Sequence, residues 1–234
     1  MRMDICTIPL SEIFEPRDGC PVCRMRDMLD ERYTEYITGA AMMEPDERIR
    51  TNELGFCNRH YSMMLKGKHR LQVALMLSSH LDSLDNDIFG GSRKLFKPSP
   101  KKSLYRSARV TDTCFICERA EKSMEAFFKT MFSLYETDRD FRKLFSEQTG
   151  VCLPHYALLC EKSEYLLSKK MTPDFRKELD RLTRTALSKL REDVLHFTKM
   201  YDYRNSGENA DWGNSRDSIE RSVRFLTGFD KGDE

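Results

Sequence analysis

One set of cysteines and histidines occurs twice in this 234-residue chain and constrains the fold more than any other feature. Each copy has a Cys-x-x-Cys pair followed, after a long gap, by a Cys-x-x-His pair. In chain order the pairs are Cys20 and Cys23, Cys57 and His60, Cys114 and Cys117, and Cys152 and His155. Residues 24–56 separate the pairs of the first copy and residues 118–151 those of the second, so the two gaps differ by one residue. We infer an internal duplication.

Each copy supplies three thiols and one imidazole, which is the ligand set of a tetrahedral zinc site. Ligands three residues apart lie on one side of a helical turn, so each pair can present two ligands to one ion if it begins a helix. Pro21 and Pro154 favour this placement, because the first turn of a helix tolerates proline. The spacing predicts two zinc ions, one per copy. The first is assigned to Cys20, Cys23, Cys57 and His60, and the second to Cys114, Cys117, Cys152 and His155.

Two other metal chemistries stay open. Three cysteines and a histidine can also hold an iron–sulfur cluster, which is the main alternative cofactor. A thiol switch that releases zinc on oxidation is a further possibility. Four protein ligands leave no open position for water, which favours a structural role for zinc over a catalytic one.

Apolar residues recur at intervals of three and four over most of the chain, which predicts helices. Long helices are expected over residues 24–38, 71–88, 118–135 and 175–201. Two shorter segments, 45–53 and 138–147, would lead the chain back to the metal. The predicted fold class is all-α, with two pseudo-repeated zinc-clamped helical units packed together and a C-terminal strap.

The predicted domain organisation follows the two copies. Residues 1–90 form the first zinc-binding helical repeat and residues 111–201 the second. Between them, residues 91–110 carry seven basic residues and no acidic one, which indicates a basic linker. Residues 202–234 form a C-terminal tail with a short helix.

Charge and hydropathy limit the kinds of partner that the chain is expected to bind. The chain has 39 Lys and Arg against 38 Asp and Glu, so its overall charge gives no reason to expect nucleic-acid binding. The basic linker alone is a weak candidate for binding phosphate groups. No stretch approaches the ~18 apolar residues of a membrane span. The N-terminus has no apolar leader, so we expect reduced thiols and a cytoplasmic location.

A second candidate site lies in the tail, where acidic, basic and aromatic residues gather. Its members are Asp202, Tyr203, Arg204, Trp212, Asp217 and Arg221. Such a cluster could recognise an anion or act in acid–base chemistry. The alternative, which we favour, is that the tail packs across both copies, with Tyr201 and Trp212 buried and the charges paired at its rim. Cys6 and Cys160 fall outside the metal pattern, and a buried inert thiol is expected for Cys160.

The repeated motif, the Gly-x-Cys-x-x-His-Tyr context of the second pair in each copy, and the Tyr-Asp-Tyr-Arg-Asn run of residues 201–205 together resemble an uncharacterised bacterial domain family of cytoplasmic proteins. The resemblance covers nearly the whole chain and includes all eight ligand positions. It implies the architecture and no substrate, because the family has no assigned activity.

The sequence therefore predicts a zinc-binding helical protein that works as a non-enzymatic module for a protein or nucleic-acid partner. One alternative is a redox- or metal-responsive regulator that uses the thiolate sites. Another is an enzyme that uses the C-terminal cluster, in a concave pocket lined by Tyr203, Trp212 and the neighbouring charges.

Overall fold

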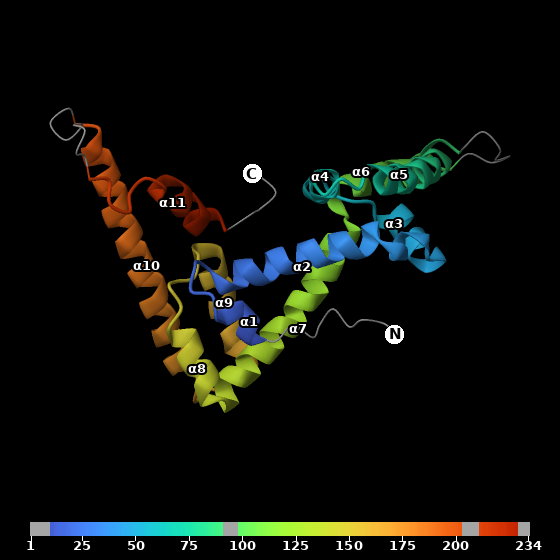
Figure 1. The fold of residues 1–234 in the computed structure, drawn as a ribbon. Helices are drawn as coiled ribbons and strands as arrows, with labels where there is room; N and C mark the ends of the chain where they lie inside the picture. The colour runs from blue at the N-terminus through green and yellow to red at the C-terminus, as the bar shows by residue number, and fades with distance from the viewer. Residues whose placement is uncertain (1–9, 91–97, 203–210, 229–234) are drawn as a thin grey trace. The chain divides into compact units, whose positions relative to one another are not determined.

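The computed structural model describes residues 10–90, 98–202 and 211–228 (Figure 1). These residues form helices joined by short loops and contain no β-strand, so the predicted all-α fold class is confirmed. None of the helices in these ranges is both long enough and apolar enough to cross a membrane.

The helices follow the predicted pattern closely. In chain order they are α1 (Leu10–Phe14), α2 (Pro21–Thr38), η1 (Ala40–Met43), α3 (Pro45–Leu54), α4 (Asn58–Lys66), α5 (Arg70–Leu84), η2 (Asp85–Phe89), α6 (Pro100–Asp112), α7 (Phe115–Thr137), α8 (Arg139–Ser146), α9 (Leu153–Leu166), α10 (Thr172–Met200) and α11 (Ser218–Thr227). The four long predicted helices correspond to α2, to α5 with η2, to α7 and to α10.

Part of the predicted basic linker is helical and belongs to α6, which Arg106 joins to α3. The Ser99 hydroxyl caps α6 by accepting a hydrogen bond from the backbone amide of Lys102. Arg106 donates to the carbonyls of Asn52 and Glu53, at 2.8 and 2.5 Å. Residues 91–97 of the linker lie outside the described part of the chain.

The chain folds into two compact units whose boundaries differ from those of the sequence copies. Among the described residues, unit 1 contains 10–25 and everything from 125 onward, and unit 2 contains 26–90 and 98–124. Helices α2 and α7 each begin in one unit and end in the other. Each unit therefore contains residues from both copies.

Unit 1 has an aromatic core. The rings of Phe14, Phe132, Phe145 and Phe175 are fully buried. Phe175 packs edge-on against Phe132 and Tyr135, with ring centroids 5.1 and 5.0 Å away. Burying each such side chain stabilises the fold by about 2–3 kcal/mol. Helix α1 packs against α8, and α9 and α11 pack against α10 (Figure 1).

Unit 2 has a core of aliphatic, methionine and aromatic side chains with a few buried polar contacts. Leu29, Ile37, Met64 and Met76 are almost completely buried. Helix α5 packs against α3, α4 and η2. The Tyr33 hydroxyl lies 2.7 Å from the Ser123 hydroxyl, so a buried polar contact joins the parts of α2 and α7 that belong to this unit.

Candidate metal centres

The structure gathers the eight predicted ligands into two groups, in each of which all ligand atoms lie within 4.8 Å of one another. Quartet A, in unit 1, consists of Cys20, Cys23, Cys152 and His155. Quartet B, in unit 2, consists of Cys57, His60, Cys114 and Cys117. Each quartet combines the Cys-x-x-Cys pair of one copy with the Cys-x-x-His pair of the other. The predicted partition into one site per copy is therefore wrong.

Helix lengths explain the exchange of pairs. Helix α2 has 18 residues, which is about 27 Å at 1.5 Å per residue. The segment expected to return, α3, has 10 residues, or about 15 Å. In the second copy, α7 has 23 residues and α8 has 8. Because each return helix is much shorter than the outgoing one, the Cys-x-x-His pair falls short of its own Cys-x-x-Cys pair and meets that of the other copy.

All four ligand pairs lie at helix N-termini, as the spacing predicts. Cys57 and Cys152 are the N-cap residues of α4 and α9, and Cys20 and Cys114 directly precede α2 and α7. Backbone amides without helical partners and the positive end of the helix dipole favour thiolate over thiol there. The local fold thus prepares the sulfurs to bind a cation.

The distances in quartet B suit one tetrahedral ion. The Nδ1 atom of His60 lies 3.1 Å from the sulfur of Cys57, 3.3 Å from that of Cys114 and 3.5 Å from that of Cys117. The sulfurs of Cys57 and Cys117 are 3.9 Å apart. Zinc bound tetrahedrally at about 2.3 Å to sulfur and 2.0 Å to nitrogen separates sulfur from nitrogen by about 3.5 Å and sulfur from sulfur by about 3.8 Å.

Quartet A has nearly the same dimensions. Its Nδ1 atom, on His155, lies 3.6, 3.3 and 3.1 Å from the sulfurs of Cys20, Cys23 and Cys152. The sulfurs of Cys23 and Cys152 are 3.6 Å apart. In both quartets two ligand residues are buried and two are half-buried. The two sites could therefore hold ions of the same kind.

The quartets also have the electrostatics of cation sites. Burial lowers the pKa of His60, but contacts with Asp30 and with the sulfurs of Cys114 and Cys57 raise that pKa to about 11. Burial likewise lowers the pKa of His155, and the sulfurs of Cys152 and Cys20 raise it to about 10. Each imidazole therefore faces negative charge, and a metal ion that binds there must displace a proton.

Two glycines let the third ligand of each copy approach closely. Gly55 has a φ of 63°, and a Cβ atom there would lie 3.0 Å from the Nε2 atom of His80. Its carbonyl accepts a hydrogen bond from the Phe115 amide, which fixes the loop before Cys57 to the start of α7. At Gly150 a Cβ atom would lie 2.5 Å from the Cβ atom of Ala186 on α10.

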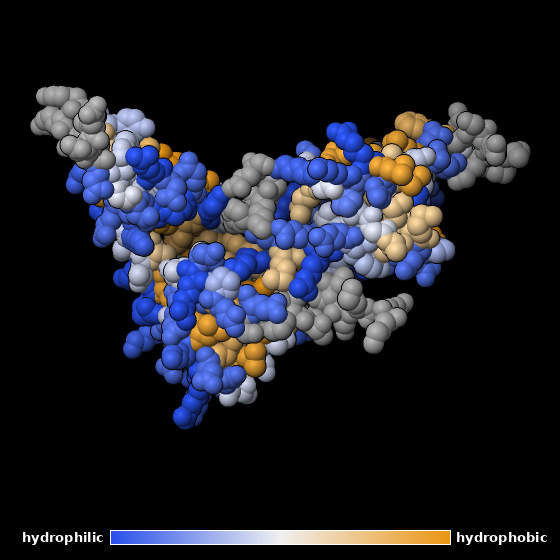
Figure 2. Space-filling view, viewed as in Figure 1, coloured by the Kyte–Doolittle hydropathy of each residue, from blue (hydrophilic) through white to orange (hydrophobic). Residues whose placement is uncertain are grey.

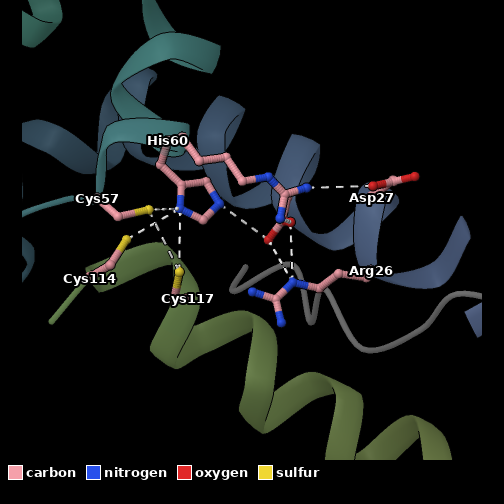
Figure 3. Close-up of polar contacts among 8 residues, drawn as sticks. Arg26, Asp27, Cys57, His60, Cys114 and Cys117 are labelled. Atoms are coloured by element: carbon pink, nitrogen blue, oxygen red, sulfur yellow. Dashed lines mark hydrogen bonds and ion pairs between the residues drawn. The ribbon is translucent and has the colours of Figure 1, made fainter. Parts of the chain in front are cut away.

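A buried charge network adjoins quartet B, and the ligand pattern alone did not reveal it (Figure 3). The Nε2 atom of His60 lies 3.3 Å from the carboxylate of Asp30, which is fully buried on α2. Arg59 contacts the same carboxylate at 2.9 Å and Arg26 at 3.2 Å. The sequence did contain a signal, because Asp30 shares a helical face with the apolar residues Tyr33 and Ile37.

The comparisons with known proteins agree with the predicted resemblance. A family model described as a family of unknown function matches residues 1–233. The chain belongs to this family, DUF6062. No curated protein and no solved structure matches the chain. Membership of DUF6062 carries no activity or partner with it, so the function has to be argued from the site.

The structure describes part of the C-terminal cluster of this DUF6062 protein. Tyr203 and Arg204 lie outside the described residues, and Asp202 is half-buried just after α10. Trp212 packs edge-on against Phe197 and Tyr201, with ring centroids 5.7 and 6.0 Å away. The rings pack as the packing alternative expects, but they are not buried as it predicted, since Tyr201 is 72% exposed and Trp212 is half-buried.

The charges of the same cluster pair between α10 and α11. Arg221 contacts the carboxylate of Asp193 at 2.8 Å and that of Asp217 at 2.9 Å. Helix α11 has its main contacts with α10 and α9, so the strap lies on unit 1. Of the remaining cysteines, Cys160 is half-buried rather than buried and belongs to neither quartet, and Cys6 lies outside the described residues.

Proposed function

We propose that two zinc ions, one in each quartet, stabilise the two units, and that the protein is a non-enzymatic module that binds a partner protein. The observation that carries the first part is the spacing of the quartets, where four ligand atoms converge at the distances of one tetrahedral zinc ion. Four protein ligands complete that coordination and leave no position for a substrate or water.

The geometry favours zinc over an iron–sulfur cluster. The ligands of a cluster bind different iron atoms, so they must surround a larger group. In each quartet the three sulfurs lie 3.1–3.6 Å from one Nδ1 atom, that of His60 or of His155. Ligands that converge on one point support a single ion.

A zinc ion in either quartet would join helix starts that are far apart in sequence. In unit 1 it would link the start of α2 to the start of α9, and in unit 2 it would link the start of α4 to that of α7. Structural zinc contributes ~10 kcal/mol or more of apparent binding free energy, which becomes free energy of folding.

Metal analysis tests this role. We expect protein purified without added metal to be colourless and to hold two zinc ions per chain. A strong chelator should then reduce the helical circular dichroism signal, because the helix starts lose their link. Cys160→Ser, outside both quartets, should retain two ions and serves as the control. A brown protein with an absorption band near 400 nm, or unchanged thermal stability after complete metal removal, would contradict the proposal.

An exposed apolar face of α5 and η2 supports a protein partner. Leu71, Leu75, Leu81 and Phe89 have exposed fractions of 70, 45, 59 and 70%. Figure 2 shows hydrophobic side chains gathered over this part of unit 2. Apolar surface of this kind marks sites of protein interaction more than sites of nucleic-acid binding, which depend on basic charge.

Site-specific photo-crosslinking tests the surface. A photoreactive residue at Leu75 should crosslink to one partner protein, whereas the same residue at Leu187, which is 47% exposed on α10, should not. With that partner purified, Leu75→Glu should weaken the complex at least tenfold and Leu187→Glu should leave it unchanged. Crosslinks to nucleic acid, or equal effects of the two glutamates, would contradict a protein-binding role for this face.

Partial exposure of the thiolates favours a redox-responsive regulator as a second candidate. Cys57 and Cys117 are half-buried, with sulfurs 3.9 Å apart. Peroxide could oxidise the two thiolates to a disulfide, while the peroxide is reduced to water and the zinc ion is released. Zinc release measured with a chromophoric chelator tests this, and a reductant should restore binding. Zinc that stays bound at peroxide concentrations that oxidise ordinary thiols would exclude this role.

A further inference from the structure

The two ring nitrogens of His60 have different surroundings. Nδ1 faces the three sulfurs of quartet B, and Nε2 faces the carboxylate of Asp30 at 3.3 Å (Figure 3). A carboxylate beside the outer nitrogen holds the proton there, so that the Nδ1 lone pair is directed at the metal. It also makes the imidazole a stronger ligand.

Asp30 is itself held by two arginines. Its side chain has no exposed surface, and Arg59 and Arg26 contact it at 2.9 and 3.2 Å. A second buried acid, Asp27, contacts Arg59 at 3.5 Å and belongs to the same network. Buried ion networks are often no more stabilising than apolar residues of similar volume, so stability of the fold alone gives no reason for this one. The position of the network behind the metal ligand His60 gives a functional reason for it.

The second sequence copy lacks the whole network. When the Cys-x-x-Cys pairs are aligned, Arg26 corresponds to Ala120 and Asp30 to Met124. When the Cys-x-x-His pairs are aligned, Arg59 corresponds to Pro154, next to His155. None of these three side chains is charged, so none can replace the Asp30 carboxylate as an acceptor for an imidazole N–H. The polar support is therefore a property of quartet B and has no counterpart at the equivalent positions.

We infer that Asp30 is a positioning residue for His60, and that it makes quartet B the tighter of two unequal zinc sites. This inference rests on the proposed zinc-binding function, since it concerns the affinity of one of the two sites. Quartet A would then exchange or lose its ion first. Removal of a carboxylate behind a metal-bound histidine typically weakens metal binding by about 10–100-fold.

The order of zinc loss can be tested on the unmodified protein. Zinc-loaded protein is treated with increasing amounts of chelator, and freed thiols are alkylated and located by mass spectrometry. We expect Cys20, Cys23 and Cys152 to be alkylated before Cys57, Cys114 and Cys117. Exposure alone would favour the opposite order, because two cysteines of quartet B and one of quartet A are half-buried. Simultaneous labelling, or earlier labelling of quartet B, would overturn the inference.

Asp30→Asn tests the positioning role directly, with Glu35→Gln, at an exposed position of the same helix, as the matched control. Zinc titration in competition with a chromophoric chelator should show that Asp30→Asn weakens the tighter step by about 10–100-fold and leaves the weaker step unchanged. Glu35→Gln should change neither step. Nitrogen NMR should show a shift of the His60 Nε2–H resonance in Asp30→Asn and none for His155, which loss of stability alone would not produce.

The outcomes separate the two proposals. Protein that takes up no zinc, with all thiols equally reactive, would contradict the proposed function. Two zinc ions bound with equal affinity, together with an unchanged titration of Asp30→Asn, would leave the zinc-binding function intact and overturn the role of Asp30.

Discussion

Gly150 is expected to tolerate no side chain. An added Cβ atom would lie 2.5 Å from that of Ala186, so Gly150→Ala should lower the free energy of unfolding by about 1–3 kcal/mol through overpacking. Urea denaturation of the zinc-loaded protein measures the loss.

The matched control is the compensating variant. Ala186→Gly alone should cost about 1 kcal/mol, because glycine is a poor helix former. Combined with Gly150→Ala it should restore space, so that the double variant is more stable than Gly150→Ala. Simple additivity of the two losses would show that this contact does not limit the loop.

His80 should make unit 2 sensitive to acid. Burial lowers its pKa, the Asn52 carbonyl opposes this shift, and the charge of Arg106 adds to it. Above the ordinary imidazole value of about 6.5, His80 is neutral in both states and stability does not depend on it. Below that pH the unfolded chain takes up the proton more readily, so the free energy of unfolding falls.

Urea denaturation at pH 7.5 and pH 5.5 compares the unmodified protein with His80→Asn, whose amide can still donate to the Asn52 carbonyl. The unmodified protein should lose more stability on acidification. Release of zinc at low pH affects both proteins equally, so only the difference between them reports on His80. Equal losses would show that protonation of His80 does not destabilise the fold.

The eight ligands are predictable from the sequence because thiols and imidazoles in a repeated spacing have few other uses. The role of Asp30 is not, because an acid on an otherwise apolar helix face predicts burial but does not say which group it meets. Its partners His60 and Arg59 come from α4, and sequence spacing does not bring α4 to α2.

At the scale of helices, periodicity and turn residues were sufficient to locate most of the fold. The apolar stripes of residues 118–135 and 175–201 predicted α7 and α10 nearly to their ends. The charge pattern of residues 91–110 predicts a linker, whereas the structure has the helix α6 over Pro100–Asp112. The capping Ser99 and the following Pro100 are a helix start signal that the charge pattern obscured.

Helix α8, which returns the chain toward quartet A, should depend on its N-cap. The Asp138 carboxylate accepts hydrogen bonds from the amides of Asp140 and Phe141, at 2.8 and 3.3 Å. Asp138→Ala should lower the free energy of unfolding by about 1 kcal/mol. Arg139→Ala, at the neighbouring exposed position, should have little effect in the same thermal denaturation experiment and provides the comparison. Equal effects would exclude a specific capping role.

At the scale of the whole molecule, the duplication could be predicted but the pairing of its parts could not. A Cys-x-x-Cys pair and a Cys-x-x-His pair complete a tetrahedral site whether they come from one copy or from two. The choice depends on how far α3 and α8 return along α2 and α7. That distance follows from helix ends and loops, which are the parts of a fold that sequence patterns locate least well.

The crossed pairing predicts which double variants lose one ion and which lose two. Cys20→Ala with Cys152→Ala removes two ligands of quartet A, so the protein should keep one zinc ion, in quartet B. Cys20→Ala with Cys57→Ala removes one ligand from each quartet, so both ions should bind weakly and be lost on dialysis. Native mass spectrometry and metal analysis count the ions. Sites formed within each copy would give the reverse result, because Cys20 and Cys57 would then share one ion, and each double variant removes the same number of thiols.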